Sequence, residues 1–115
     1  MSEFQKLTKK ILAFRDERNW EQFHNPKDVS LSLVLEAAEV MEHFQWKSPA
    51  EIKEYVVSHK EEIGEELSDV LYWVLLLAHD LKIDLIGASE KKLEKNRKKY
   101  PVEKARNRHA KCDKL

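Results

Sequence analysis

Two pairs of carboxylates stand in strongly apolar parts of this sequence. Glu36 and Glu39 are three residues apart within an apolar stretch, and Glu66 and Asp69 have the same spacing just before the apolar run from Val70 to Ala78. Residues three apart share one face of a helix. Crowded, partly buried carboxylates repel one another unless a cation or a proton compensates their charge. Because Mg²⁺ and Mn²⁺ prefer oxygen ligands, the pattern predicts a divalent metal site on these four carboxylates.

The carboxylate pairs are also compatible with an ordinary helix surface. Acidic residues number 21 of 115, so such pairs arise by chance and often mark a solvated helix face. Zinc is disfavoured because no His or Cys cluster has ligand spacing. A di-iron bundle is disfavoured too, since it expects two Glu-x-x-His motifs and only Glu21 to His24 fits.

The balanced total charge, 21 basic against 21 acidic residues, hides a dipolar chain. Residues 28–69 are strongly acidic, whereas residues 91–115 are strongly basic. Lys92 and Asn96 are four apart in the basic segment, and such donors beside metal-bound carboxylates would suit a polyphosphate. The acidic and basic segments could equally attract each other. Nucleic acid is disfavoured as a partner, because Tyr100 is the only aromatic residue in the basic segment.

Four aromatic residues flank the acidic segments, and a nucleobase could stack on them. They are Trp20, Phe23, Trp46 and Trp73. Each could instead serve core or interface packing, because Trp and Phe bury a large area. We expect some of the four to contact a base.

Several blocks of the chain, in order, resemble the MazG-like all-α nucleoside triphosphate pyrophosphohydrolases, and in particular the dCTP pyrophosphatase branch. Beside Glu36-x-x-Glu39, the similar blocks are Trp20-Glu21-Gln22-Phe23-His24, Phe44-Gln45-Trp46, Glu65-Glu66-Leu67-Ser68-Asp69-Val70-Leu71 and Asn96-Arg97-x-x-Tyr100-Pro101. The resemblance covers most of the chain, from about Trp20 to Pro101.

This resemblance implies a Mg²⁺-dependent hydrolysis between the α and β phosphates of a nucleoside triphosphate, such as dCTP or a related or modified nucleotide. The implied metal ligands are Glu36, Glu39, Glu66 and Asp69. Lys92 and Asn96 match phosphate and sugar contacts, and Trp20, Trp46 and Trp73 match aromatic residues of the base pocket. The family also implies homodimers or homotetramers with sites between subunits.

A catalytic hypothesis follows from the implied reaction: Glu36 or Glu39 orients the attacking water and takes its proton. One departure concerns the base. Members of the dCTP type can carry His nine residues before the tryptophan, where this chain has Ile11. A polar contact to the base would then be missing, which bears on cytosine selectivity and leaves the metal chemistry unchanged.

Helical periodicity and few helix breakers, 2 Gly and 3 Pro, predict an all-α fold of four to five helices. Asp28 or Ser30 could cap the second helix, Ser48 and Ser58 each begin a capping-box pattern, and Asp84 could cap the last helix. The expected helices are Ser2 to Trp20, Val29 to Trp46, a short one from Ser48, a long one from Ser58 to Asp80 or Leu81, and one from Asp84 to Tyr100.

We expect residues 1–115 to form a single MazG-like domain with a loosely held basic tail over about 102–115. The helix around Leu31 to Phe44 and the run from Val70 to Ala78 are apolar nearly all round, which predicts a homo-oligomer with a shared helical core. One densely packed bundle is the alternative. A lone Cys112, no secretory segment and no membrane-length apolar run favour the cytoplasm. The rival function is a non-catalytic helical module for oligomerisation or nucleotide binding.

Overall fold

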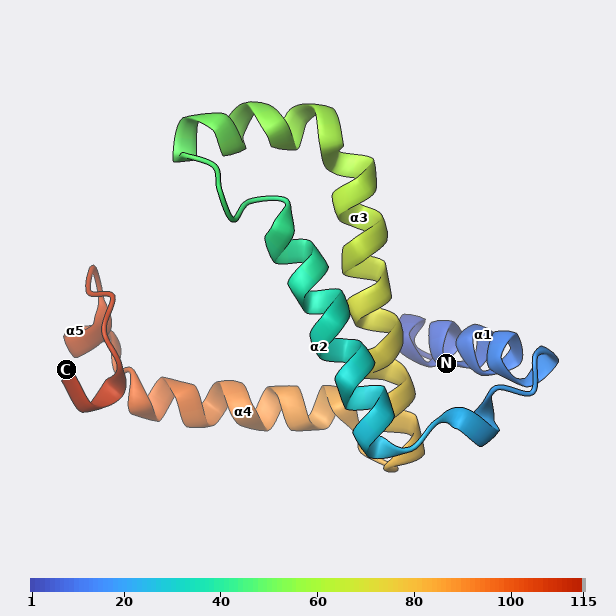
Figure 1. Cartoon of the computed structure of the whole chain (residues 1–115). Helices are drawn as coiled ribbons and strands as arrows, with labels where there is room; N and C mark the ends of the chain where they lie inside the picture. The colour runs from blue at the N-terminus through green and yellow to red at the C-terminus, as the bar shows by residue number, and fades with distance from the viewer. Residues whose placement is uncertain (115) are drawn as a thin grey trace. The chain divides into compact units, whose positions relative to one another are not determined.

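The computed structural model describes residues 1–114, and these are helical with no β-strand among them, which confirms the all-α prediction (Figure 1). The described residues form five α-helices, with one 3₁₀ segment between α1 and α2 and another after α5. The elements are α1 (Glu3–Glu17), η1 (Glu21–Phe23), α2 (Pro26–Glu42), α3 (Pro49–Asp80), α4 (Leu85–Lys99), α5 (Val102–Ala105) and η2 (Cys112–Lys114).

The chain divides into two compact units, Met1–Lys82 and the part from Ile83 onward. The first unit contains α1, α2 and α3, and the second contains α4, α5 and η2. No helix among the described residues is long and apolar enough to cross a membrane.

Helix α2 begins earlier than predicted, and a different residue caps it. The side chain of Asn25, not that of Asp28 or Ser30, accepts the hydrogen bond that caps the helix, from the backbone N–H of Asp28 at 2.9 Å. Pro26 occupies the first turn, where its missing N–H costs nothing. The Asn-Pro pair therefore begins the helix. The helix also ends at Glu42, before the predicted Trp46.

Helix α3 contains one of the two predicted capping boxes. Ser48 and Glu51 cap each other reciprocally, with Pro49 in the first turn, as predicted. The box predicted at Ser58 is wrong, because the Ser58 hydroxyl donates to the carbonyl of Tyr55 at 3.2 Å. The helix instead runs through this point with a kink, where His59 has non-helical dihedral angles of φ −124° and ψ 20°. The two predicted helices thus form one bent helix that ends at Asp80 (Figure 1).

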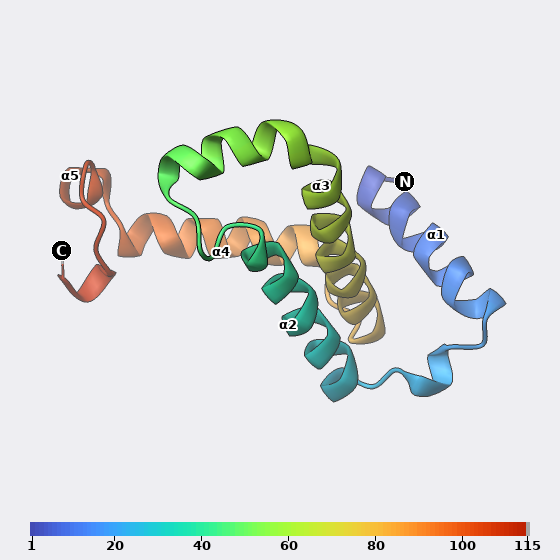
Figure 2. The ribbon, with the colours of Figure 1, turned by 45° about the horizontal axis from the view of Figure 1, so that its top comes forward.

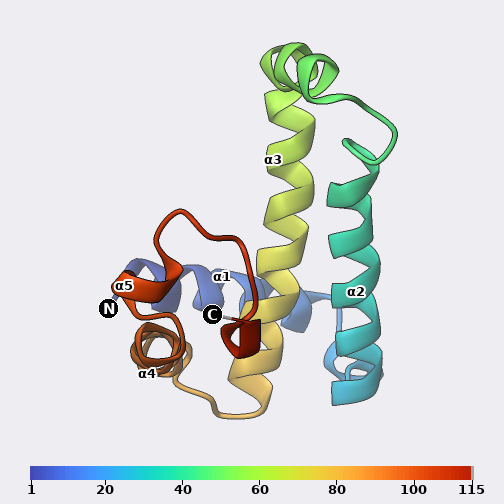
Figure 3. The same cartoon turned by 90° about the vertical axis from the view of Figure 1, so that its left-hand side faces the viewer.

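In the first unit, α1 and α2 both pack against the second half of α3. Helix α2 runs alongside that half in the opposite direction (Figure 3), and α1 lies on its other flank (Figure 2). The buried residues are Ile11, Arg15, Val29, Leu75, Leu76 and Ala78. This core is small, because the three helices of the unit meet only along the second half of α3.

Helix α2 has a broad apolar face that the single chain leaves exposed. Leu31, Val34, Leu35 and Met41 are 57%, 64%, 58% and 50% exposed. Their spacing places them along one side of the helix. The apolar residues around α2 are thus not all buried within one copy of the chain.

The second unit begins and ends its main helix where the sequence predicts. The side chain of Asp84 accepts the N–H of Gly87 at 3.2 Å and caps α4. The helix stops before Tyr100 and Pro101, because proline cannot continue the hydrogen-bond pattern. Residues 102–114, the predicted tail, contain the short α5 and η2.

Candidate active site

A cavity of about 450 Å³ lies where the three helices of the first unit meet. It brings together four residues singled out in the sequence, Glu36 and Asp69 with Trp20 and Trp73. The other residues that line it are Lys10, Ile11, Phe14 and Tyr72. Carboxylates and aromatic rings around one space make this cavity the candidate active site.

The four predicted metal ligands lie close enough to influence one another. The pKa of the Glu36 carboxyl is raised, first by loss of hydration and then by Glu39, Asp69 and Glu66. The neighbouring carboxylates thus add to the effect of burial in disfavouring the charged form of Glu36. One carboxylate oxygen of Glu36, Oε2, is buried and has no hydrogen-bond partner within residues 1–114.

The chemistry of these donors fits a hard divalent cation, because all four are carboxylates. Their side chains do not already form a coordination sphere: among the described residues, no three His, Cys, Asp or Glu side chains converge on one point. Glu39 and Asp69 are exposed, so their side chains have room to rearrange, and Glu36 offers an unpaired buried oxygen. The fit therefore rests on the donor types and their mutual repulsion.

Glu66 has a contact that the sequence did not predict. Nε2 of His43, at the end of α2, lies against the carboxylate oxygen Oε2 of Glu66. The other ring nitrogen of His43, Nδ1, lies 2.5 Å from the hydroxyl of Tyr55. In the sequence, His43 is only a residue one turn beyond Glu39. Nothing there points to Tyr55, because the kink at His59 determines how the first part of α3 lies against α2.

The aromatic side of the cavity is a row of rings that meet edge to face. The ring centroids are 5.7 Å apart for Phe14 and Trp20, 6.2 Å for Phe14 and Tyr72, and 4.9 Å for Tyr72 and Trp73. Burial raises the pKa of the Tyr72 phenol, so the ring stays neutral. Sequence reasoning missed Phe14 and Tyr72, which have the spacing of ordinary apolar positions of a helix.

Ile11 contributes an apolar surface to the same cavity. Its side chain is only 8% exposed and belongs to the core of the first unit. The side chain therefore offers no hydrogen bond to a ligand in the cavity. Lys10 is the one basic side chain among those that line it.

Four other predicted site residues of the first unit do not line this cavity: Glu39, Glu66, Phe23 and Trp46. Phe23 and Trp46 are 63% and 86% exposed. Lys92 and Asn96 belong to α4 in the second unit, where Lys92 is exposed and Asn96 is half-buried. One copy of the first unit thus gathers two of the four predicted aromatic residues.

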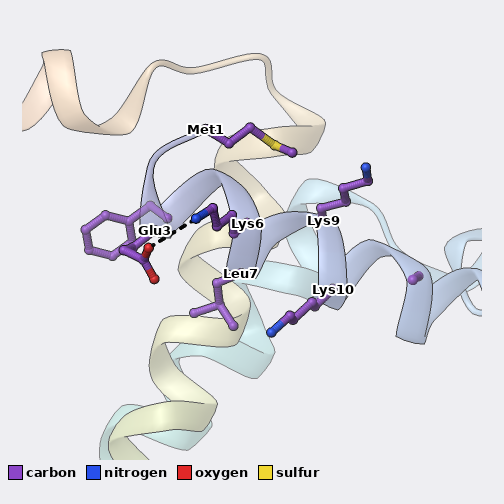
Figure 4. A pocket seen from close by; sticks show the side chains of 8 residues that line it. Met1, Glu3, Lys6, Leu7, Lys9 and Lys10 are labelled. Carbon is purple, nitrogen blue, oxygen red and sulfur yellow. Dashed lines mark ion pairs between the residues drawn. The ribbon is translucent and has the colours of Figure 1, made fainter.

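A larger cavity of about 610 Å³ lies along α1 (Figure 4), and none of the four paired carboxylates lines it. Lysines and apolar side chains line it, and its one acidic residue, Glu3, pairs with Lys6 at 3.5 Å. Both partners of this pair are well exposed, so it contributes little to stability. With no group placed for acid–base or metal chemistry, this larger cavity is not the candidate active site.

The chain is similar to proteins whose names describe pyrophosphatases. It is 45% identical to dCTP pyrophosphatase 1 of Rattus norvegicus over 95 residues, which cover 81% of this chain and 56% of that protein. For dCTP pyrophosphatase 1 of Homo sapiens the identity is 41% over 104 residues, covering 89% of this chain and 61% of that protein. The chain therefore spans little more than half the length of these curated relatives.

A solved structure shares the fold. The crystal structure of a pyrophosphatase from Archaeoglobus fulgidus DSM 4304 superimposes with a TM-score of 0.83 at 38% sequence identity, covering 88% of this chain and 94% of that chain. Residues 31–115 match the sequence profile of the MazG-like family, and this segment includes both carboxylate pairs. The chain belongs to the MazG-like family.

Proposed function

We propose that this chain is a Mg²⁺-dependent nucleotide pyrophosphohydrolase. It cleaves a nucleoside triphosphate, dCTP or a related or modified nucleotide, between the α and β phosphates and releases the monophosphate and pyrophosphate. The observation that carries the proposal is the cavity that Glu36 and Asp69 share with an aromatic wall containing Trp20 and Trp73. Such a cavity suits a ligand with a flat apolar end and a highly charged end. The names of the relatives and of the structural neighbour support the same reaction.

The aromatic wall is the proposed place of the base. A nucleobase is a flat aromatic system and can stack on the face of such a ring or meet its edge. Ile11 supplies no hydrogen bond, so discrimination between bases falls to shape and to the few polar groups of the lining, Lys10 among them. The names of the relatives support the preference for dCTP, and a different preference would be attributed to the apolar Ile11.

The carboxylates are the proposed ligands of Mg²⁺, with Mn²⁺ as a substitute. Glu36, Glu39, Glu66 and Asp69 would hold the cation, and the unpaired oxygen of Glu36 supports this assignment. A bound divalent cation supplies neutralisation of phosphate charge and lowers the pKa of a water molecule.

In the proposed reaction, the carboxylate of Glu36 or Glu39 orients a water molecule and accepts its proton. The water oxygen forms a bond to the α phosphorus while the bond from that phosphorus to the bridging oxygen breaks. The bridging oxygen leaves with the β and γ phosphates as pyrophosphate. The amine of Lys92 stabilises the charge of the departing group, and Asn96 contacts the sugar.

Self-association is part of the proposal. The exposed apolar face of α2, with Leu31, Val34, Leu35 and Met41, is large for a monomer in water. A second copy of the chain would cover this face in a homodimer, and further copies would cover it in a homotetramer. Either assembly would let α4 of one copy bring Lys92 and Asn96 to the site of another.

Pyrophosphate release from a panel of nucleoside triphosphates, with Mg²⁺ and with EDTA, tests the reaction. We expect metal-dependent release, with dCTP or a pyrimidine analogue as the fastest substrate. Faster release from a triphosphate with another base would still support the proposed reaction. The different base preference would then be attributed to the surroundings of Ile11. No release from any triphosphate would refute the enzyme and favour the rival function, a non-catalytic helical oligomerisation or nucleotide-binding module.

The metal is tested separately by thermal unfolding of the Glu36→Gln variant. Removal of one repelling charge should raise the melting temperature of the metal-free protein and reduce the stabilisation that added Mg²⁺ provides. These two shifts have opposite directions, so a general loss of packing cannot mimic them. Glu54→Gln, which removes an exposed carboxylate of α3, is the matched control and should change neither quantity. Equal Mg²⁺ stabilisation of Glu36→Gln and the unaltered protein would exclude Glu36 as a ligand.

A further inference from the structure

Helix α1 forms one side of the cavity, yet only two of its residues are buried. These are Ile11 and Arg15, one turn apart on the same face. Arg15 is only 2% exposed, and a buried guanidinium is costly unless its charge is paired. The attachment of α1 to the rest of the unit therefore depends heavily on which group pairs with the charge of Arg15.

Asp80, the last residue of α3, pairs with Arg15. Nη1 and Nη2 of Arg15 donate to the two carboxylate oxygens of Asp80 at 2.9 and 3.1 Å, a bidentate arrangement that fixes both side chains. The pair raises the pKa of Arg15 further, so the guanidinium stays charged. Nε has no hydrogen-bond partner within residues 1–114, and a second carboxylate, that of Glu21, is 4.0 Å away and mostly exposed. Asp80 is thus the principal partner of this buried cation.

The backbone of Arg15 also determines where Trp20 lies. Its carbonyl oxygen accepts the N–H of Arg18 at 3.2 Å and the N–H of Trp20 at 3.1 Å. Asn19, with φ 54°, has the left-handed conformation that turns the chain back. Its N–H donates to the backbone carbonyl of Asp16 at 3.0 Å. This is a Schellman motif, in which the chain closes over the end of the helix. A shift of Arg15 would therefore move Trp20 as well.

The two ends of the ion pair belong to the two helices that build the aromatic wall. Arg15 is adjacent to Phe14 and its carbonyl is hydrogen-bonded to the backbone of Trp20, and these two rings form the α1 side of the wall. Asp80 is on α3, which supplies Tyr72 and Trp73 to the same wall. The pair therefore joins the two halves of the wall without lining the cavity itself.

We propose that Arg15 and Asp80 are positioning residues that hold the α1 half of the aromatic wall, Phe14 and Trp20, against its α3 half, Tyr72 and Trp73, and thereby set the affinity for the nucleotide. This inference rests on the proposed function for its kinetic consequence. Without the pair, apolar contacts such as those of Ile11 and Phe14 would have to hold α1, and Phe14 and Trp20 would no longer lie at a fixed position relative to Tyr72 and Trp73. The carboxylates of α2 and α3 would keep their places. Base binding should weaken while the chemical step is retained.

The test compares steady-state kinetics of Asp80→Asn and Arg15→Met with the unaltered chain. A small displacement of positioning groups has a large effect on binding geometry, so we expect KM to rise roughly tenfold or more, with kcat changed less than about twofold. Lys6→Met, which removes an exposed ion pair on the same helix, is the control and should change neither. An unchanged KM in both variants, or a loss confined to kcat, would overturn the proposal.

A double variant distinguishes positioning from a direct effect of charge on the substrate. Arg15→Met with Asp80→Leu replaces the partly buried ion pair by an apolar pair, which can pack without the cost of an unpaired charge. If the pair acts by position, the double variant should recover most of the affinity lost in Arg15→Met. If the double variant stays as weak as Arg15→Met, the charge itself is required and the positioning role is refuted.

Two measurements keep this inference separate from the proposed reaction. Hydrogen–deuterium exchange of α1 should rise in Asp80→Asn. The tryptophan emission of the chain should shift to the red as water reaches Trp20 and Trp73, because the exposed Trp46 contributes equally in both proteins. Both are read without substrate. If the unaltered chain releases no pyrophosphate, the proposed function fails. The exchange and emission measurements still test whether the ion pair positions α1. If exchange and emission stay unchanged in Asp80→Asn, the inference fails whatever the enzyme does.

Discussion

The imidazole of His43 links two other side chains at the junction of α2 and α3. Nε2 lies against the carboxylate of Glu66, and Nδ1 lies 2.5 Å from the hydroxyl of Tyr55. If Nε2 carries the ring proton and faces Glu66, Nδ1 is left to accept the hydroxyl proton of Tyr55. The backbone carbonyl of His43 in turn accepts the amine of Lys47 at 2.7 Å. The Glu66 carboxylate is therefore held in one orientation by residues outside the proposed metal site.

Replacement of His43 by alanine should weaken Mg²⁺ binding. A carboxylate ligand that loses its orienting partner binds a metal about 10–100-fold more weakly. Calorimetric titration of the metal into the protein without nucleotide measures this directly. Tyr55→Phe should show a smaller loss in the same direction, because it removes only the outer hydrogen bond. His79→Ala, at an exposed position of α3, is the control, and an affinity for Mg²⁺ that His43→Ala leaves intact would contradict the prediction.

His24 should make stability depend on pH. Its ring packs edge to face against Trp73, with centroids 5.4 Å apart, and burial together with the charge of Arg15 lowers its pKa, while Asp80 and Glu21 act in the opposite direction. A lowered pKa means that the unfolded chain binds a proton more readily than the folded chain. The contribution of neutral His24 is therefore complete above the ordinary His pKa of about 6.5, and it is lost as the pH falls from there towards the lowered value.

The His24→Phe variant isolates this effect, since phenylalanine keeps the ring contact with Trp73 and cannot take a proton. Urea unfolding between about pH 7.5 and 5, a range that spans the ordinary His pKa, should show a smaller loss of stability for His24→Phe than for the unaltered chain. His109→Phe, in the second unit and exposed, serves as the control. Parallel curves for His24→Phe and the unaltered protein would show that the pKa of His24 is the same in the folded and the unfolded chain.

Two serines with the same sequence pattern should differ in their contribution to stability. Ser48 caps α3 through its hydroxyl, which accepts the N–H of Glu51 at 3.2 Å, whereas Ser58 caps nothing. Ser48→Ala should cost about 1 kcal/mol of unfolding free energy, the usual value of a lost N-cap. Ser58→Ala should change stability by less than about 0.5 kcal/mol. Equal losses in the two variants, measured by urea unfolding, would be inconsistent with one bent helix across Ser58.

The same pair of serines shows why the helix boundaries were only partly predictable. Capping patterns describe local chemistry, and at Ser48 local chemistry decides the result because a proline follows in the first turn. At Ser58 the preceding residues already form a helix, and continuing it avoids the cost of a new helical start. The sequence pattern therefore indicated an irregularity close to His59. It predicted the start of a new helix there, whereas the structure has a kink in a continuous helix.

The candidate site was predictable to the extent that it depends on spacing within a helix. Glu36 and Asp69 stood out because carboxylates are rare among apolar residues, and the structure places both at one cavity. Phe14 and Tyr72 did not stand out, because an aromatic residue on an apolar face is also what any core contains. The partnership of Arg15 with Asp80 spans 65 positions and depends on how α1 lies against α3, which periodicity does not encode.

Trp46 provides a test of the proposed assembly. Its side chain is 86% exposed and does not line the cavity, although the family resemblance places it in the base pocket. Both statements hold together if Trp46 of one copy reaches the cavity of another. Trp46→Ala should then lower activity without lowering the stability of the isolated chain. Mixed with Glu36→Gln, it should recover activity, because a mixed dimer contains one site with neither substitution.

The size of the recovery distinguishes sites shared between copies from sites within one copy. Random exchange in a dimer makes half of the assemblies mixed, with one intact site in two, so the mixture should reach about a quarter of full activity. Glu36→Gln mixed with Glu39→Gln is the matched control. Since Glu36 and Glu39 act from the same helix, every site in that mixture carries one substitution and no activity returns. If the Trp46→Ala mixture also shows no recovery beyond the sum of its components, Trp46 does not act across an interface, and the base pocket is formed without it.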